Sequence, residues 1–150
     1  MKQGETLRLQ NRPEDVARAG EILRGGGLVG IPTETVYGLA ANALDAQAVG
    51  RIFTAKGRPQ DNPLIVHIAR WEDMLPLVTE VPAAAEALAQ DYWPGPLTMI
   101  LPRSDRVPAA VSAGLGTVAI RMPSHPVARA VILAAGVPLA APSANRSGSP

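Results

Sequence analysis

The sequence predicts an α/β protein with a mixed sheet, and two features of its pattern lead to that prediction. Short apolar runs typical of buried strands, such as Leu64–Ile68, alternate along the chain with stretches of helical periodicity. After Trp93, two short strands are expected in close succession, at residues 97–101 and 118–120. The first feature indicates α/β architecture and the second indicates mixed strand directions. The length of 150 residues fits a single domain.

The first elements along the chain are expected to be an edge strand and a helix. Leu7 and Leu9 alternate with polar neighbours, which is typical of an edge strand. Asn11 is a suitable cap for a helix that Pro13 opens and Gly25 ends.

The later elements follow from apolar periodicity interrupted by proline and glycine. They are expected to be a helix capped by Asp45 with Ala48, Val49, Ile52 and Phe53 on its inner face, a strand at Leu64–Ile68, helices at Trp71–Leu77 and Pro82–Gln90, strands at Leu97–Leu101 and Val118–Ile120, a helix at Pro126–Ala135 closed by Gly136, and a strand at Pro138–Ala141.

Composition disfavours nucleic-acid binding and excludes chemistry that depends on cysteine. A net charge of +1 is too weak a bias to identify a nucleic-acid binder, and 3% aromatic residues leave few rings on which bases could stack. The absence of cysteine excludes disulfides, thiolate zinc sites and a cysteine nucleophile, and two histidines cannot form a three-histidine metal site. Residues 1–11 lack the apolar core of a signal peptide, so a cytoplasmic protein without a membrane segment is expected.

The first candidate site follows the buried strand Gly27–Ile31. Pro32 is expected to end this strand because proline has no N–H to donate. Thr33, Thr35 and Tyr37, with the Glu34 carboxylate among them, then place polar groups where open α/β sheets commonly bind ligands. The alternative is that the two threonines only cap a short helical turn.

The second candidate site is the loop from Lys56 to Asn62. Lys56 and Arg58 stand two residues apart beside a glycine and a proline, which is typical of a clamp for a polyphosphate. Asn62 adds an amide at the entry to the next strand. The alternative is a solvated loop in which Lys56 complements the carboxyl end of a helix.

Three further strand ends carry polar groups. His67 lies in an apolar strand, on the same face as Ile65 by alternation, and is either a satisfied core group or a general base. Thr117 and Arg121 bracket another strand, where a buried guanidinium requires a partner such as a carboxylate of the protein or of a substrate. The strand that ends at Ala141 is followed by further hydroxyl and amide groups, at Ser143, Asn145 and Ser147. We expect these groups to converge on one cavity.

Five motifs then occur in a distinctive order. They are Pro32–Leu39, Lys56–Pro59 with Asn62–Leu64 and His67, Trp93–Thr98, Arg121–Pro123, and Ser143–Asn145 with Ser147–Gly148. Together they resemble the YrdC-like threonylcarbamoyl-adenylate synthase family, over nearly the whole chain from about Pro13 onward. The resemblance implies a twisted mixed sheet flanked by helices, with a concave basic cavity.

The activity that the resemblance implies is a nucleotidyl transfer. L-Threonine, bicarbonate and ATP would condense with Mg²⁺ to threonylcarbamoyl-AMP and pyrophosphate, the first step in making threonylcarbamoyladenosine in tRNA. The resemblance assigns threonine binding to Thr35, His67, Arg121 and Ala141, ATP binding to Arg58, Asn62, Thr117 and Ser143, catalysis at the phosphates to Lys56 and Arg58, and supporting roles to Thr33, Tyr37 and Asn145. It assigns no protein side chain to the metal.

The family continues beyond the point that corresponds to Pro150. We therefore expect the domain to be incomplete at its C-terminal end. Two alternatives stay open: a related protein that acts on another carbamoyl acceptor, and an RNA-binding module. Contact with tRNA or with the downstream threonylcarbamoyl-transfer machinery also stays open, whereas no membrane partner is expected.

Overall fold

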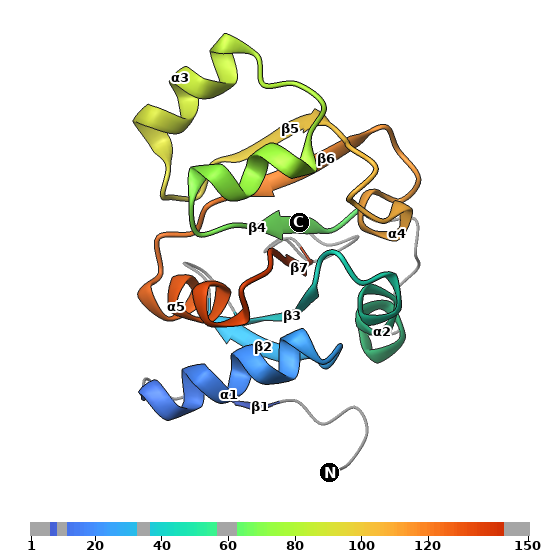
Figure 1. Ribbon diagram of the computed structural model, residues 1–150, viewed down its shortest axis with the longest axis vertical. Coiled ribbons are helices and arrows are strands. Elements are labelled where there is room, and N and C mark those ends of the chain that lie inside the picture. The colour runs from blue at the N-terminus through green and yellow to red at the C-terminus, as the bar shows by residue number, and fades with distance from the viewer. Residues whose placement is uncertain (1–6, 9–11, 33–36, 57–62, 143–150) are drawn as a thin grey trace.

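The structure is a computed structural model that describes residues 7–8, 12–32, 37–56 and 63–142 (Figure 1). Its elements are, in chain order, β1 (Leu7–Arg8), α1 (Pro13–Arg24), β2 (Val29–Pro32), β3 (Tyr37–Asn42), α2 (Ala46–Lys56), β4 (Ile65–His67), the 3₁₀ helix η1 (Trp71–Leu77), α3 (Ala83–Tyr92), β5 (Thr98–Pro102), α4 (Ala109–Ser112), β6 (Thr117–Arg121), α5 (Pro126–Ala135) and β7 (Leu139–Ala141).

The described strands form one mixed sheet in the order β1-β2-β3-β7-β4-β6-β5 (Figure 1). The pairs β1–β2 and β4–β6 are parallel, and the other four neighbouring pairs are antiparallel. The prediction of an α/β fold with mixed strand directions is therefore confirmed. Strand β7, late in the sequence, lies in the middle of the sheet between β3 and β4.

The register defines two faces of the sheet. Partners opposite each other point to the same side, so Leu139, His67, Arg121 and Thr98 form one row across β7, β4, β6 and β5. We call the side that carries this row face A. The adjacent row points to the opposite side, face B, and consists of Ala140, Val66, Ile120 and Met99.

Helices α1 and α5 cover one part of face A. Their buried residues pack with those of β2, β3 and β7 in a cluster that contains Ala19, Leu23, Val29, Ile31, Ala40, Ala69, Val131, Ile132, Ala135, Leu139 and Ala141. The two helices approach closely at Gly20, where an added Cβ would lie 2.7 Å from the carbonyl carbon of Ala134. Glycine permits this contact because it has no side chain to separate the backbones.

The remaining helices cover face B. Val49, Ile52 and Phe53 of α2 pack in the same cluster as Met74 of η1, residues of α3 and α4, and the face B row. Asp45 caps α2 as predicted, because its Oδ1 accepts hydrogen bonds from the backbone N–H groups of Gln47 at 3.0 Å and Ala48 at 3.2 Å.

Several predicted elements differ in detail from the structure. Strand β3 was not predicted, because its residues Gly38, Ala40 and Ala41 have low strand propensity and are held by pairing with β2 and β7. Strand β2 ends at Pro32 as predicted, and Pro32 still pairs with Tyr37 because a proline keeps its carbonyl acceptor.

The predicted helix bounds agree with the structure for α5 but only in part for α1, and α4 was not predicted. Helix α1 begins at Pro13 as predicted, but its N-cap residue is Arg12, which makes no side-chain cap bond; Asn11 lies outside the described residues. Helix α5 has the predicted bounds, and Gly136 closes it with a φ of 71°. The short helix α4 was not predicted, since four residues are too few to show a helical period.

Candidate active site

The structure describes a third of the predicted site residues. His67, Thr117, Arg121 and Ala141 are described together with their side chains. Outside the described residues lie Thr33, Thr35, Arg58, Asn62, Ser143 and Asn145, and the side chains of Tyr37 and Lys56. The predicted convergence of all these groups on one concave basic cavity therefore stays a prediction.

The four described candidates share face A. His67 and Arg121 are register partners on the parallel strands β4 and β6. Ala141 is the partner of Ile65, two residues before His67, and Thr117 stands four residues before Arg121 on the same strand. Because side chains alternate along a strand, all four point to one side of the sheet.

Along the strand direction, however, their backbones lie at different positions. We use "edge" here for the side of the sheet at which the strands begin or end, not for its outermost strands. His67 and Arg121 end β4 and β6, at what we call the Arg121 edge, whereas Thr117 lies at the other end of β6, which we call the Thr117 edge. Ala141 lies level with Ala119, midway between these two edges. Four residue steps along β6 separate Thr117 from Arg121 by roughly 13 Å. The carboxyl ends of the strands do not gather at one edge, because the strand directions are mixed. A shared site is possible only along face A.

Arg121 is buried, with 6% of its surface exposed. Its Nε–H donates a hydrogen bond of 3.1 Å to the carbonyl oxygen of Gly95. One partner of the guanidinium is thus a backbone carbonyl, and the expected carboxylate partner stays a prediction. Gly95 belongs to the Trp93–Thr98 motif, and its contact with Arg121 depends on the fold.

His67 is buried beside Arg121, with 2% of its surface exposed. Its Nδ1 lies 3.1 Å from the carbonyl oxygen of Ile65. Since a carbonyl can only accept, this contact assigns the proton to Nδ1 and orients the ring. The backbone of β4 therefore provides the orienting group that the sequence did not reveal.

Over β6 and β5, which α1 and α5 do not cover, several side chains of face A are exposed to solvent. Thr117 is exposed and Ala119 is half-buried. The side chain of Ile100, the register partner of Ala119, is 68% exposed. An open face with a buried guanidinium and an oriented imidazole at one edge suits the binding of a small anion such as a carboxylate.

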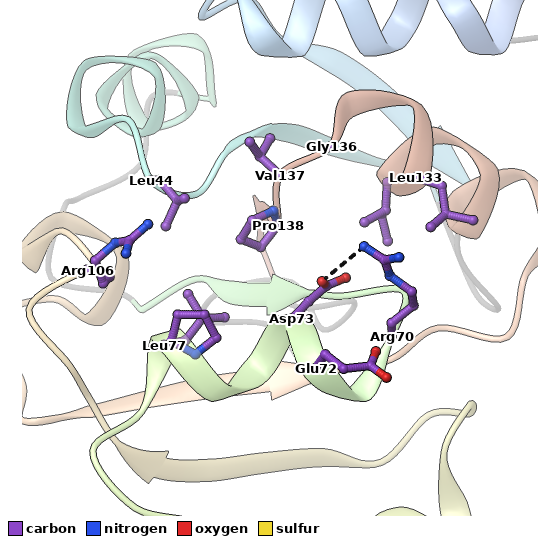
Figure 2. A pocket seen from close by; sticks show the side chains of 12 residues that line it. Leu44, Arg70, Glu72, Asp73, Leu77, Arg106, Leu133, Gly136, Val137 and Pro138 are labelled. Atoms are coloured by element: carbon purple, nitrogen blue, oxygen red, sulfur yellow. Dashed lines mark hydrogen bonds and ion pairs between the residues drawn. The ribbon is translucent and has the colours of Figure 1, made fainter.

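The described residues also form two cavities elsewhere. One, of about 160 Å³, lies between η1, α5 and the segment before β7, with Arg70, Asp73, Arg106 and Leu133 among its lining residues (Figure 2). Arg70 contacts Asp73 at 3.5 Å there, so the charges of this cavity are mixed. The second, of about 270 Å³, lies between Trp71, Trp93 and α3. Neither cavity is lined by any of the four described candidates.

Within the described part of the chain, no three His, Cys, Asp or Glu side chains are grouped as metal ligands. None of the described helices is long and apolar enough to cross a bilayer.

Comparison with known proteins identifies the family. The family model Sua5_yciO_yrdC, described as telomere recombination, matches residues 21–150. The chain belongs to the Sua5/YciO/YrdC family. The resemblance noted in the sequence is thereby confirmed over most of the chain.

Two relatives of this family member are named threonylcarbamoyl-AMP synthase. The chain is 58% identical over 132 residues to the protein of Pyrococcus abyssi, and 51% identical over 146 residues to that of Bacillus subtilis. These alignments cover 88% and 97% of the chain, but only 39% and 42% of the relatives. The chain thus spans about two fifths of their length.

A solved structure supports the fold. The structure of P. abyssi Sua5 complexed with L-threonine matches with a TM-score of 0.88 and 53% identity, covering 97% of this chain and 43% of that one. The twisted mixed sheet expected from the resemblance is therefore the observed fold.

Proposed function

We propose that this chain carries the catalytic fold of a threonylcarbamoyl-AMP synthase, a nucleotidyltransferase that uses L-threonine, bicarbonate and ATP. The observation that carries the proposal is the buried pair of His67 and Arg121 on face A, in a fold that closely matches a protein solved with L-threonine. The names of the relatives support the same activity.

The chemistry requires positioning more than a covalent nucleophile. Threonine and bicarbonate combine, with loss of water, to an N-carboxylate, which attacks the α-phosphorus of ATP in line and displaces pyrophosphate. The sequence has no cysteine, and this mechanism needs none. The protein must hold two anionic substrates close together and neutralise their charge.

Arg121 and His67 are the proposed contacts for threonine. Arg121 provides a fixed positive charge for the amino-acid carboxylate, and its burial strengthens that attraction relative to a solvated site. His67, whose ring is oriented by the Ile65 carbonyl, is proposed to add a polar contact to the same substrate. Ala141 belongs to the wall of the same face, and Thr35 completes the proposed threonine contacts.

ATP is proposed to lie toward the Thr117 edge. Thr117 is exposed there and can contact the nucleotide through its hydroxyl group. The proposed phosphate contacts are Lys56 and Arg58, those to the rest of ATP are Asn62 and Ser143, and Thr33, Tyr37 and Asn145 support the site. Mg²⁺ is proposed to bind mainly through the ATP phosphates and water, and to neutralise phosphate charge.

The setting of the activity is also part of the proposal. We treat residues 1–150 as part of one domain of a cytoplasmic enzyme, since ATP and tRNA are available in that compartment. The product would pass to the machinery that transfers the threonylcarbamoyl group to tRNA.

Calorimetry of ligand binding tests the assignment. Arg121→Ala should weaken L-threonine binding by about 10- to 150-fold, the typical value of a hydrogen-bonded charge, and leave ATP binding unchanged. Arg58→Ala should weaken ATP and not threonine. Arg18→Ala, an exposed arginine of α1, is the matched control.

Pyrophosphate release tests the reaction itself. Release that requires both threonine and bicarbonate supports the synthase, whereas release indifferent to threonine contradicts it. Loss of neither ligand in either arginine variant would also overturn the assignment.

A further inference from the structure

The turn Trp93–Pro96 makes direct hydrogen bonds to the end of β6 that carries Arg121. Gly95 uses both of its backbone groups there: its N–H donates to the carbonyl of Met122 at 2.8 Å, and its carbonyl accepts from Nε of Arg121 at 3.1 Å. The turn leads directly into β5, whose first residue, Thr98, is the register partner of Arg121.

The turn is itself closed by the Trp93 side chain. The indole N–H donates to the carbonyl of Leu97 at 2.8 Å, across the turn. The backbone N–H of Trp93 also closes the end of α3 on the carbonyl of Ala89 at 2.9 Å. Trp93 is 9% exposed, and its ring contacts that of Trp71 with 6.3 Å between centroids.

Only glycine fits at position 95. A Cβ added there would lie 2.6 Å from the carbonyl oxygen of Tyr92, a distance that real Cβ atoms do not adopt. The close fit keeps the Gly95 carbonyl near Arg121. Since a guanidinium is planar, a bond at Nε limits the rotation of the whole group.

We infer that Trp93 and Gly95 are positioning residues: the turn that they close holds the Arg121 guanidinium in the orientation that binds the carboxylate of the amino-acid substrate. The substrate part of this inference rests on the proposed function. The turn acts through Arg121 and makes no contact with the reacting atoms. Its effect should therefore appear in amino-acid affinity and not in nucleotide affinity.

The first experiment needs no substrate. In the NMR spectrum of the ¹⁵N-labelled chain, the Nε–H signal of Arg121, identified by its loss in Arg121→Lys, should exchange slowly with solvent. Trp93→Phe removes the indole donor but keeps an aromatic ring, and it should speed this exchange at least tenfold. Trp71→Phe removes the neighbouring indole, which lies outside the turn, and should leave the exchange unchanged. An unchanged signal in Trp93→Phe overturns the inference.

The second experiment measures substrate affinity. Trp93→Phe should weaken L-threonine binding about three- to tenfold, the value of one net hydrogen bond, with ATP affinity unchanged. In the Arg121→Lys background, the same change should cost no further affinity, because the group that the turn orients is gone. Equal losses in both backgrounds would show that the turn does not act through Arg121.

Two possible outcomes require a further variant or a separate interpretation. If Trp93→Phe lowers the unfolding temperature below the working range, Trp93 is replaced by its benzothiophene analogue, which has the shape of indole without the N–H. If the unmodified chain binds no threonine, the proposed function fails, and the substrate part of the inference fails with it. The exchange measurement then still decides whether the turn holds the guanidinium.

Discussion

Face A of the sheet has two regions, one covered by helices and one exposed to solvent. Over β2, β3 and β7, helices α1 and α5 exclude water, and Ile31 is fully buried. Over β6 and β5, Ile100 on the same face is 68% exposed. The alternation of side chains is the same in both regions. The covered region buries apolar surface that stabilises the fold, whereas the open region leaves apolar side chains such as Ile100 in contact with solvent.

The largest expected effect is the difference in stability between alanine variants of two isoleucines, one in each region. Ile31→Ala should lower the free energy of unfolding by about 2–5 kcal/mol, because it leaves a cavity under α1 and α5. Ile100→Ala should change it by less than about 0.5 kcal/mol, since little buried area is lost. Urea denaturation of both variants measures the difference. Equal losses would mean that the open region is part of the core.

The second effect concerns the contact that seals the covered region. Gly20→Ala should destabilise the protein by about 1–3 kcal/mol, because the new methyl group would lie within 3 Å of the Ala134 backbone and separate α1 from α5. Gly50→Ala is the control. Position 50 lies in α2 with no atom within 4 Å of the added Cβ, so this change should stabilise by about 0.5–1 kcal/mol. Thermal unfolding should show opposite shifts, and shifts of the same sign would contradict the close approach of the two helices.

The third comparison concerns Ala119, half-buried in the open region. Ala119→Leu should change the free energy of unfolding by under about 1 kcal/mol, because the side chain can extend over the open face. The same volume increase at Ala40, buried under α1 and α5, should cost about 1–3 kcal/mol. Ala119→Leu should still weaken binding of ATP or threonine in calorimetry. Unchanged affinity for both ligands would exclude this part of face A from the site.

Local signals in the sequence were sufficient for much of the fold. Asp45 predicted the start of α2, and Gly136 predicted the end of α5, because caps depend on a few adjacent residues. Strand β3 could not be predicted in this way, since its alanines and glycine form a strand only through partners distant in the chain. Strand directions likewise depend on distant partners, so the two edges of the site were not foreseen.

The sequence was sufficient to predict which residues belong to the candidate site, but not which groups they contact. The position of Arg121 after an apolar run indicated a buried guanidinium that needs a partner. That one partner is the Gly95 carbonyl follows only from the antiparallel pairing of β5 with β6. The orientation of His67 by the Ile65 carbonyl depends on the ring rotamer, which no sequence pattern encodes.

The central position of β7 has a consequence for synthesis on the ribosome. Among the described strands, only β7 pairs with both β3 and β4, so it joins a sub-sheet of β1, β2 and β3 to one of β4, β6 and β5. A nascent chain that has not yet released residues 139–141 from the exit tunnel lacks this link. Such a late, long-range closure gives the fold a high contact order and leaves two inner strand edges unprotected until translation has passed that point.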